Sequence, residues 1–256
     1  ISSDDWDGLI IASSTNSIPK ILDHAIKKGK PILVEKPVSL GVNYLKKFKK
    51  NTIQNINVAF NRRYYSSINI AKKFLFNSKN KCIINIKIPE KVFQYKKNKF
   101  NKFSNVYNNS CHIFDIIFYL LDDVRILHKS QNSKIVLLKS IDNHLCNLLL
   151  NYNSPDNFSI EIENGNQRLL LKPLEKYYLY QGIQIFDPTN KFPLRLYKPK
   201  LINQGDIFSA NTKRLIKPGF LEQAKDFKRV LYNKKSRISA KLYDAFRAQN
   251  LINEIL

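Results

Sequence analysis

A lysine at the end of an expected strand is the first candidate for chemistry in this sequence. Glu35-Lys36-Pro37 follows the apolar run Pro31-Ile-Leu-Val. Proline fixes its own φ and biases the preceding residue towards an extended conformation, so the Lys36 side chain is held in one direction. An ammonium group at a strand end is suited to hydrogen bonding with a substrate hydroxyl or a ribose. Taken alone, the tripeptide is better explained as an ordinary junction between a strand and a turn.

A second candidate is the histidine that begins an apolar stretch. His112 opens residues 112–121, which are expected to form a helix. Near pH 7 a neutral imidazole can accept the proton of an alcohol. From the residues alone, a capping or core histidine at a helix start is the simpler interpretation. His128 and His144 have no carboxylate or cysteine at metal-ligand spacing, so no metal site is predicted.

The elements around Lys36 are expected in the order strand, helix, strand. Residues 7–13 are an apolar run bounded by turn formers, which is typical of a strand buried in a parallel sheet. A helix with apolar residues at helical spacing follows over Ile18–Ile26, with Pro19 in its first turn. Residues 31–35 form the next strand. These segments span about 30 residues, as a right-handed βαβ unit does.

Ligands of an open α/β sheet lie at the carboxyl ends of its strands. The first strand ends in small polar residues, which allow a dinucleotide to approach the backbone at a helix N-terminus. These expected cofactor-binding residues are Ser13, Ser14, Thr15 and Asn16. A helix over residues 40–50 and a strand over residues 56–60 complete the first part. Residues 1–60 are therefore interpreted as the C-terminal part of a Rossmann-type domain.

From residue 61 the pattern changes to short alternating strands mixed with helices. Such a pattern indicates an α+β domain with an open, mainly antiparallel sheet, here over residues 61–256. Strands are expected at residues 81–88, 135–138, 145–151, 159–163 and 167–171, and helices at residues 67–77, 112–121, 219–232 and 241–256. Residues 181–212 are rich in Pro, Asn and aromatic residues and are predicted to form a long structured loop.

Four motifs, in order along the chain, resemble the Gfo/Idh/MocA family of NAD(P)-dependent oxidoreductases. The first is the whole run DGLIIASSTNSIPKILDHAIKKGKPILVEKPVSL, which contains the family's Glu-Lys-Pro signature. The others are Asn61-Arg-Arg-Tyr, the helix start Ser110-Cys-His-Ile-Phe-Asp, and Pro218-Gly-Phe-Leu-Glu with the final helix. The resemblance extends over the whole chain. It implies reversible hydride transfer between NAD or NADP and a hydroxyl-bearing carbon, usually of a sugar.

The resemblance also implies roles for single residues. Lys36 would lie near the reacting hydroxyl and the nicotinamide ribose, with Glu35 beside it, and His112 would be the acid/base partner. Independently of the resemblance, Arg62 and Arg63 follow the strand that ends near residue 60 and could face the cofactor or a substrate phosphate. Arg63 is selected as the cofactor contact, although a plain salt bridge fits almost as well. The open sheet of the second domain would form a homo-oligomer.

Two departures from the family pattern limit this interpretation. Many members carry an aspartate four residues before the histidine, where this chain has Asn108. Asparagine can bind a sugar hydroxyl but cannot take its proton, so acid/base work would depend on His112 or Lys36. The chain also begins at Ile1, contains no methionine, and has no GxGxxG among its seven glycines. It is therefore expected to be an N-terminally truncated enzyme, and NAD and NADP cannot be distinguished.

Composition bounds the remaining function classes. The hydrophobic content of 43% favours a folded chain, and no apolar run approaches the ~20 residues that cross a bilayer. The cysteines form no CxxC pair, which favours a reducing compartment. The chain is therefore expected to be soluble and cytoplasmic. The three cysteines are Cys82, Cys111 and Cys146. The net charge of +23 is mostly lysine spread along the chain and is explained by codon bias, so nucleic-acid binding is not expected.

The substrate is expected to be a nucleotide-linked or acidic sugar, of the kind used in surface-polysaccharide pathways. Basic and aromatic groups near the expected cleft suggest this, because cations hold a diphosphate or carboxylate while tyrosines stack on rings. They lie in residues 171–178, 195–199 and 217–220. A non-catalytic binding or scaffold protein is the alternative, because of Asn108 and the missing phosphate loop. A nucleic-acid binder is a third possibility.

Overall fold

A computed structural model describes residues 6–48, 55–93, 102–132, 134–207, 216–236 and 238–256. The first part contains a small parallel sheet of three strands in chain order. They are β1 (Leu9–Ile11), β2 (Ile32–Val34) and β3 (Ile56–Val58). All three residues of β2 and of β3 are buried. Short apolar runs of this kind form strands because both faces of a central parallel sheet are covered.

Helix α1 (Ile18–Ile26) connects β1 to β2 and packs beside them. Its apolar side chains recur at helical spacing, so that Ile18, Leu22 and Ala25 lie on one buried face. The helix ends before Gly29, which has the positive φ of 66° expected after a helix C-terminus. The βαβ unit predicted from the sequence is confirmed.

The prediction of an α-helix over residues 40–50 was wrong. The described residues form only a short 3-10 helix, η1 (Tyr44–Phe48), and residues 49 and 50 lie outside the described part. Gly41 adopts a φ of 75°, and the Ser39 hydroxyl donates a hydrogen bond of 3.0 Å to its carbonyl. This turn occupies the residues where the first turn of an α-helix would have formed.

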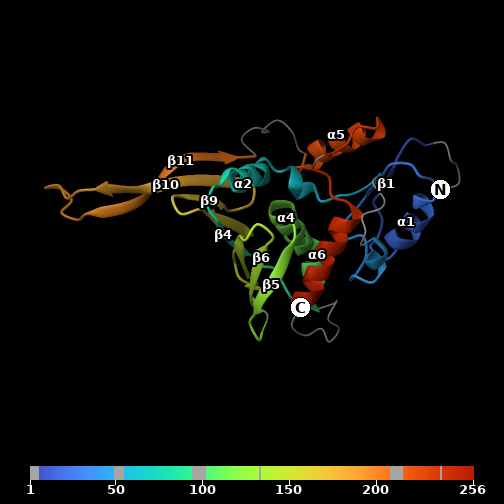
Figure 1. Cartoon of the computed structure of the whole chain (residues 1–256), viewed down its shortest axis with the longest axis horizontal. Coiled ribbons are helices and arrows are strands. Elements are labelled where there is room, and N and C mark those ends of the chain that lie inside the picture. Colours follow the sequence, from blue (N-terminus) through green and yellow to red (C-terminus); the bar gives the residue numbers. More distant parts are fainter. Residues whose placement is uncertain (1–5, 49–54, 94–101, 133, 208–215, 237) are drawn as a thin grey trace.

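The second part is built on a mixed sheet of eight strands (Figure 1). Its order is β11-β10-β9-β8-β4-β7-β6-β5, and only the β4–β7 pair is parallel. The strands are β4 (Ile83–Lys87), β5 (Val124–Lys129), β6 (Ile135–Ser140), β7 (Leu145–Leu149), β8 (Ser159–Glu163), β9 (Gln167–Leu171), β10 (Lys176–Phe186) and β11 (Leu196–Asp206). The expected combination of a partial Rossmann-type sheet with an open α+β sheet is confirmed.

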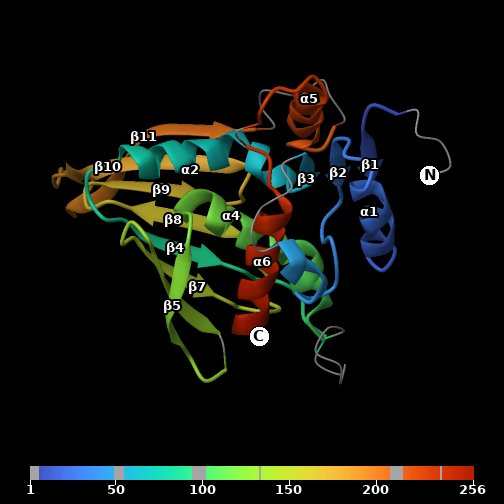
Figure 2. The ribbon, with the colours of Figure 1, turned by 45° about the vertical axis from the view of Figure 1, so that its right-hand side comes forward.

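Helices cover one face of this sheet and leave the other face open (Figure 2). The covering helices are α2 (Ser66–Asn77), α4 (Cys111–Leu121) and α6 (Leu242–Ile255). Every residue of α4 is buried, because it lies between the sheet and its neighbouring helices. Alternate strand residues such as Ile84, Ile86 and Leu148 form the covered core.

The long loop predicted over residues 181–212 was wrong. Its described residues instead complete β10 and form β11, a long antiparallel hairpin that extends beyond the rest of the sheet (Figure 1). Lysine, asparagine and proline interrupt the alternation of apolar and polar residues in these strands. The alternation is weak because neither face of the outer hairpin is buried in the core. A bulge at Gly182, with a φ of 65°, further breaks the register. Strand β5 was also not predicted, since most of its residues are exposed.

The C-terminal segment returns to the first sheet and joins the two parts. The amide of Val58 donates a hydrogen bond of 2.8 Å to the carbonyl of Ala240, so β3 pairs with the segment before α6. Helix α5 (Phe220–Leu231) packs through Phe227 against Leu33 and Ala59. The boundary between residues 1–60 and 61–256 remains a prediction.

Candidate active site

The parallel register brings three strand ends to one edge of the small sheet. Ile11, Val34 and Val58 occupy matching positions. The pairing of β2 with β1 extends one residue beyond Val34, since the Glu35 amide donates a hydrogen bond of 2.9 Å to the Ile11 carbonyl. Lys36 therefore follows the end of β2, at the edge where open α/β sheets bind ligands.

A pocket of about 330 Å³ lies at this edge, between the first sheet and the helices of the second part. It combines three cations, two carboxylates and one imidazole from distant segments of the chain. The lining residues are Glu35, Lys36, Asn61, Arg62, Tyr65, His112, Glu175, Lys217, Pro218 and Phe220. The structure thus brings together Glu35, Lys36 and His112, which the sequence singled out separately.

The ammonium group of Lys36 is held by the main chain of the helical layer. Its Nζ donates a hydrogen bond of 2.7 Å to the carbonyl oxygen of Asn108. Asn108 lies in a short π-helix, η3 (Val106–Ser110), that leads into α4. Its side chain is not among those lining the pocket, so the contact to Lys36 depends on its backbone. A catalytic role for the Asn108 amide remains a prediction.

His112 is enclosed at the start of α4, with only 4% of its surface exposed. Among the described residues its Nδ1 has no hydrogen-bond partner, and the Phe60 ring meets it edge-on at a centroid distance of 5.7 Å. Burial lowers the pKa of His112 well below its usual value, and the nearby charges of Lys36 and Arg62 lower it further. The imidazole is therefore neutral at pH 7.

The lowered pKa of His112 predicts a specific loss of stability in acid. The unfolded chain takes up a proton near pH 6.5 that the native imidazole resists, so stability is lost as the pH falls below about 6.5. For one proton the slope is at most about 1.4 kcal/mol per pH unit. His112→Gln should therefore lose less stability than the wild type between about pH 7 and pH 5. Urea unfolding at both pH values measures this difference.

The control for this experiment is His24→Gln, which changes an exposed histidine on α1. We expect it to lose as much stability in acid as the wild type. Equal losses in His112→Gln and the wild type would contradict the assignment of a proton-resisting imidazole to position 112.

The two arginines after β3 have separate roles. Both lie in the 3-10 helix η2 (Asn61–Tyr64). Arg62 lines the pocket, where its guanidinium donates to the Asn109 side chain at 3.2 Å and lies 5.1 Å from the Phe158 ring centroid. Arg63, the residue selected from the sequence as the cofactor contact, does not line this pocket. The structure favours the salt bridge that the sequence left as the alternative.

Arg63 forms a buried ion pair with Asp115, one helical turn after His112. Its Nη2 and Nε donate to the two carboxylate oxygens at 2.6 and 2.8 Å. Asp244 on α6 lies 3.6 Å from the same guanidinium. Burial raises the pKa of Asp115 to about 6, although the Arg63 charge acts to lower it. The pair is ionised at neutral pH and connects η2 to α4 and α6.

The residues predicted to approach a dinucleotide lie between β1 and α1. Ser13, Ser14 and Asn16 are exposed, as this role requires. The Ser14 carbonyl accepts the amides of Ser17 and Ile18 at 2.9 and 3.1 Å, which orders the turn. None of Ser13, Ser14, Thr15 and Asn16 lines the pocket of Lys36. Their role in cofactor binding stays a prediction.

Two residues of the pocket were not singled out for chemistry from the sequence, namely Tyr65 and Glu175. Tyr65 directly follows the Asn61-Arg-Arg-Tyr motif, and Glu175 lies within residues 171–178, which were expected near the cleft for their basic and aromatic groups. Lys217 was anticipated near the cleft, and the chain holds it there through Gly219, whose φ is 79°. A Cβ at Gly219 would lie 2.2 Å from the Asn61 carbonyl oxygen, so this close approach requires glycine. Arg195, also expected near the cleft, lies in the connection between β10 and β11, directly before β11 begins, and does not line the pocket.

The described residues contain no cluster of three histidine, cysteine, aspartate or glutamate side chains placed to hold a metal ion. Within the same residues, no helix combines the length and apolar character needed to cross a bilayer.

No family model matches this sequence, and no curated protein matches it significantly. Solved structures do match. The dehydrogenase MviM from Clostridium difficile aligns over 98% of this chain and 79% of its own, with a TM-score of 0.68 and 20% identity. Levoglucosan dehydrogenase in complex with NADH aligns over 99% and 78%, with a TM-score of 0.65 and 12% identity. UDP-N-acetylglucosamine 3-dehydrogenase GnnA from Acidithiobacillus ferrooxidans aligns over 100% and 80%, with a TM-score of 0.64 and 12% identity.

These similarities extend over both parts of the chain, so they include the small parallel sheet and the open eight-stranded sheet together. At such low sequence identities they establish architecture rather than activity. The chain therefore has the two-part fold of these dehydrogenase structures, which is the fold that the resemblance to the Gfo/Idh/MocA family implied.

Proposed function

We propose that this protein is an NAD(P)-dependent oxidoreductase that acts on a hydroxyl-bearing carbon of a sugar or nucleotide sugar. The observation that carries the proposal is the convergence of Lys36, Arg62 and a buried, neutral His112 in one pocket at the carboxyl edge of a parallel sheet. The fold shared with dehydrogenases supports it. NAD or NADP, when bound, supplies the site that accepts or returns the hydride.

The chain's own residues handle the proton and the developing charge. In the oxidative direction, the substrate O–H bond breaks and its proton passes to the neutral imidazole of His112. Lys36 stabilises the negative charge that develops on the oxygen, because its Nζ has donors left beyond the one used by Asn108. In the reductive direction, His112 returns the proton to the carbonyl oxygen. Burial of His112 strengthens its electrostatic interactions, because the local dielectric is low.

The residues around this edge fit a nicotinamide cofactor. Among the described residues, the Nδ1 atom of His112 and the Nη1 atom of Arg62 are buried without hydrogen-bond partners. Unsatisfied polar atoms of this kind are costly unless a ligand or water completes them. Ser13, Ser14, Thr15 and Asn16 would hold the dinucleotide at the end of β1, and Glu35 and Lys36 would bind its ribose.

The charge of the pocket favours an anionic substrate. Lys36, Arg62 and Lys217 outnumber the carboxylates Glu35 and Glu175. Arginine binds carboxylates and phosphates with two parallel hydrogen bonds, and its partly unsatisfied guanidinium is available here. We propose a nucleotide-linked or acidic sugar, of the kind used to build surface polysaccharides, as the substrate class.

The test is a reduction screen on the natural gene product, including any residues encoded before Ile1. NAD and NADP are each combined with neutral cyclitols, neutral sugars, uronates and nucleotide sugars, and absorbance of the reduced cofactor is followed. We expect turnover with anionic sugars. Turnover with neutral cyclitols alone would reject the substrate class. Cofactor binding with no turnover on any substrate would reject the enzyme in favour of a non-catalytic binding protein.

We further propose that the protein is a homo-oligomer. The face of the eight-stranded sheet opposite the helices carries exposed apolar side chains on three adjacent strands. They are Ile83, Ile135, Leu145 and Leu149. A sheet face of this kind is more often covered by another protein surface than left to water.

A further inference from the structure

Two cations of the active-site pocket are bonded to neighbouring residues of η3. Lys36 Nζ donates to the Asn108 carbonyl at 2.7 Å, and Nη2 of Arg62 donates to the side-chain oxygen of Asn109 at 3.2 Å. Both acceptors are neutral, so neither charge is compensated by the group that holds it. Two positive charges held this close repel each other, and more strongly where they are partly buried. An anion between them would remove this repulsion.

The carboxylates that line the pocket interact with other groups. Among the ion pairs of the described residues, none joins Glu35 or Glu175 to either cation. Glu35 Oε2 accepts the main-chain amide of Lys36 at 3.2 Å. Burial raises the pKa of Tyr65, the Glu175 carboxylate raises it further and the Arg62 guanidinium lowers it, so the Tyr65 hydroxyl contacts both charges. The pocket therefore has two cations without a directly paired carboxylate of the chain.

The guanidinium of Arg62 is held in one orientation. The Asn109 amide nitrogen donates to Glu90 Oε2 at 2.8 Å, so its oxygen faces Arg62. The Ser110 hydroxyl donates to the same Glu90 oxygen at 2.9 Å, and the Phe158 ring centroid lies 5.1 Å from the guanidinium. Within the described part of the chain, Nη1 of Arg62 is buried without a hydrogen-bond partner. Such a donor is unfavourable unless a ligand supplies an acceptor, and a carboxylate matches the planar guanidinium.

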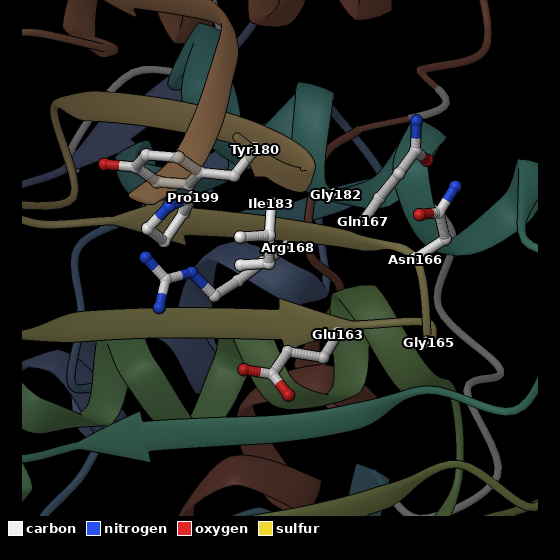
Figure 3. Close-up of a pocket in the computed structure, with 9 residues that line it drawn as sticks. All are labelled: Glu163, Gly165, Asn166, Gln167, Arg168, Tyr180, Gly182, Ile183 and Pro199. Carbon is white, nitrogen blue, oxygen red and sulfur yellow. The ribbon is translucent and has the colours of Figure 1, made fainter. Parts of the chain in front are cut away.

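A second pocket lined by an arginine provides a contrast within the same chain. It has a volume of about 240 Å³ and lies on strands β8 to β11. Figure 3 shows Glu163 and Arg168 on neighbouring strands beside it. Arg168 also pairs with Glu161 at 3.6 Å and lies 4.6 Å from the Tyr180 ring centroid. Carboxylates of the chain compensate this arginine, so an anion is not favoured there as it is beside Arg62.

We propose that the substrate sugar itself carries a carboxylate, which Arg62 and Lys36 bind on the same ring as the hydroxyl that is oxidised. The proposal rests on the proposed function and narrows its substrate class to sugar acids, either free or nucleotide-linked. Lys36 Nζ has three donors. The Asn108 carbonyl takes one of them, which leaves one for the reacting oxygen and one for the carboxylate.

A carboxylate in this position would also act on His112. Burial lowers the pKa of His112, and the charges of Lys36 and Arg62 lower it further. A bound carboxylate offsets these two charges, so the imidazole becomes a stronger base in the complex than in the free protein. The acidic substrate would thereby improve the group that takes its own hydroxyl proton, while a neutral sugar would not.

The experiment compares ligands that differ only in the carboxylate or only in the diphosphate. Isothermal titration calorimetry measures the binding of glucose, glucuronate, UDP-glucose and UDP-glucuronate to the natural gene product, and of the corresponding galactose series. NADH or NADPH is present throughout, because a reduced cofactor prevents oxidation of the sugar during the titration. We expect each acid to bind about 10- to 100-fold more tightly than its neutral counterpart, as charge-assisted hydrogen bonds imply.

Arg62→Met should raise Kd for the acids by about the same factor and leave Kd for the neutral sugars within about threefold. Arg62→Lys keeps the charge but cannot form two parallel hydrogen bonds, so it should lose about 3- to 10-fold for the acids. The control is Arg229→Met, which removes an exposed arginine on α5 and should leave every Kd within about twofold. Circular dichroism melting, together with binding of the neutral sugars, shows whether each variant is folded.

The outcomes separate this proposal from the proposed function. Absence of a preference for the acid in every pair would overturn the carboxylate site. Equal weakening of UDP-glucose and UDP-glucuronate by Arg62→Met would assign Arg62 to the diphosphate and overturn it as well. Cofactor reduction with neutral sugars alone would leave an oxidoreductase but contradict the sugar acid. Binding of acids that depends on Arg62, with no cofactor reduction by any of them, would support the carboxylate site and reject the oxidoreductase.

Discussion

Replacing Lys36 with methionine is expected to lower kcat/KM for the sugar substrate about 10²–10⁴-fold. Methionine keeps an apolar stem of similar length but has no donor for the Asn108 carbonyl, which Lys36 Nζ contacts at 2.7 Å. It also removes the charge that would stabilise an alkoxide beside His112. Steady-state kinetics with the substrate found by the reduction screen measures the effect.

The control for Lys36→Met is Lys20→Met, which removes an exposed lysine on α1. We expect kcat/KM of this control to stay within about twofold of the wild type. Cofactor fluorescence titration tells whether a loss in Lys36→Met lies in binding or in the chemical step. A Lys36→Met enzyme with nearly wild-type kcat/KM would remove this residue from the mechanism.

The second large effect is expected for Asp115→Ala, which should destabilise the native state by about 3–5 kcal/mol at pH 7. The change leaves the Arg63 guanidinium buried without its bidentate partner, since the two side chains are 6% and 1% exposed. Asp244, at 3.6 Å, compensates only part of that charge. Urea unfolding followed by circular dichroism measures the difference in free energy.

A matched control exists in the same chain. Asp187 pairs with Arg195 at 2.7 Å, but these side chains are 71% and 55% exposed. Asp187→Ala should change the free energy of unfolding by less than about 1 kcal/mol, because water screens an exposed pair. If the two variants were destabilised equally, burial of the Arg63–Asp115 pair would not determine its contribution.

Sequence reasoning placed Lys36 at the end of a strand and His112 at the start of a helix because both follow strong local patterns. Lys36 comes directly after three buried residues of β2, and His112 begins the uniformly apolar α4. Such patterns locate an element without knowledge of its neighbours. The parallel register of β1, β2 and β3 then follows from the βαβ order, so the shared edge could be predicted as well.

What the sequence did not reveal depends on contacts between distant segments. Choosing between Arg62 and Arg63 requires the orientation of η2, where successive side chains point in widely different directions. The contact from Lys36 depends on the backbone of a π-helix, which has no side-chain signature. Residues 181–212 were predicted to form a loop because the outer parts of β10 and β11 do not pack against the core. Each of these features depends on residues that are distant in the sequence and become neighbours only in the folded chain.

The pairing of Val58 with Ala240 has a consequence for the order of events during synthesis. A segment near the end of the chain completes the environment of a strand near its beginning. The nascent chain therefore emerges with β3 unpaired on one side, and the pocket is incomplete until Lys217 has been translated. Contacts so distant in sequence make folding slow and leave apolar strands exposed on the ribosome. We expect β3 to reach its native packing only after the segment around Ala240 has been synthesised.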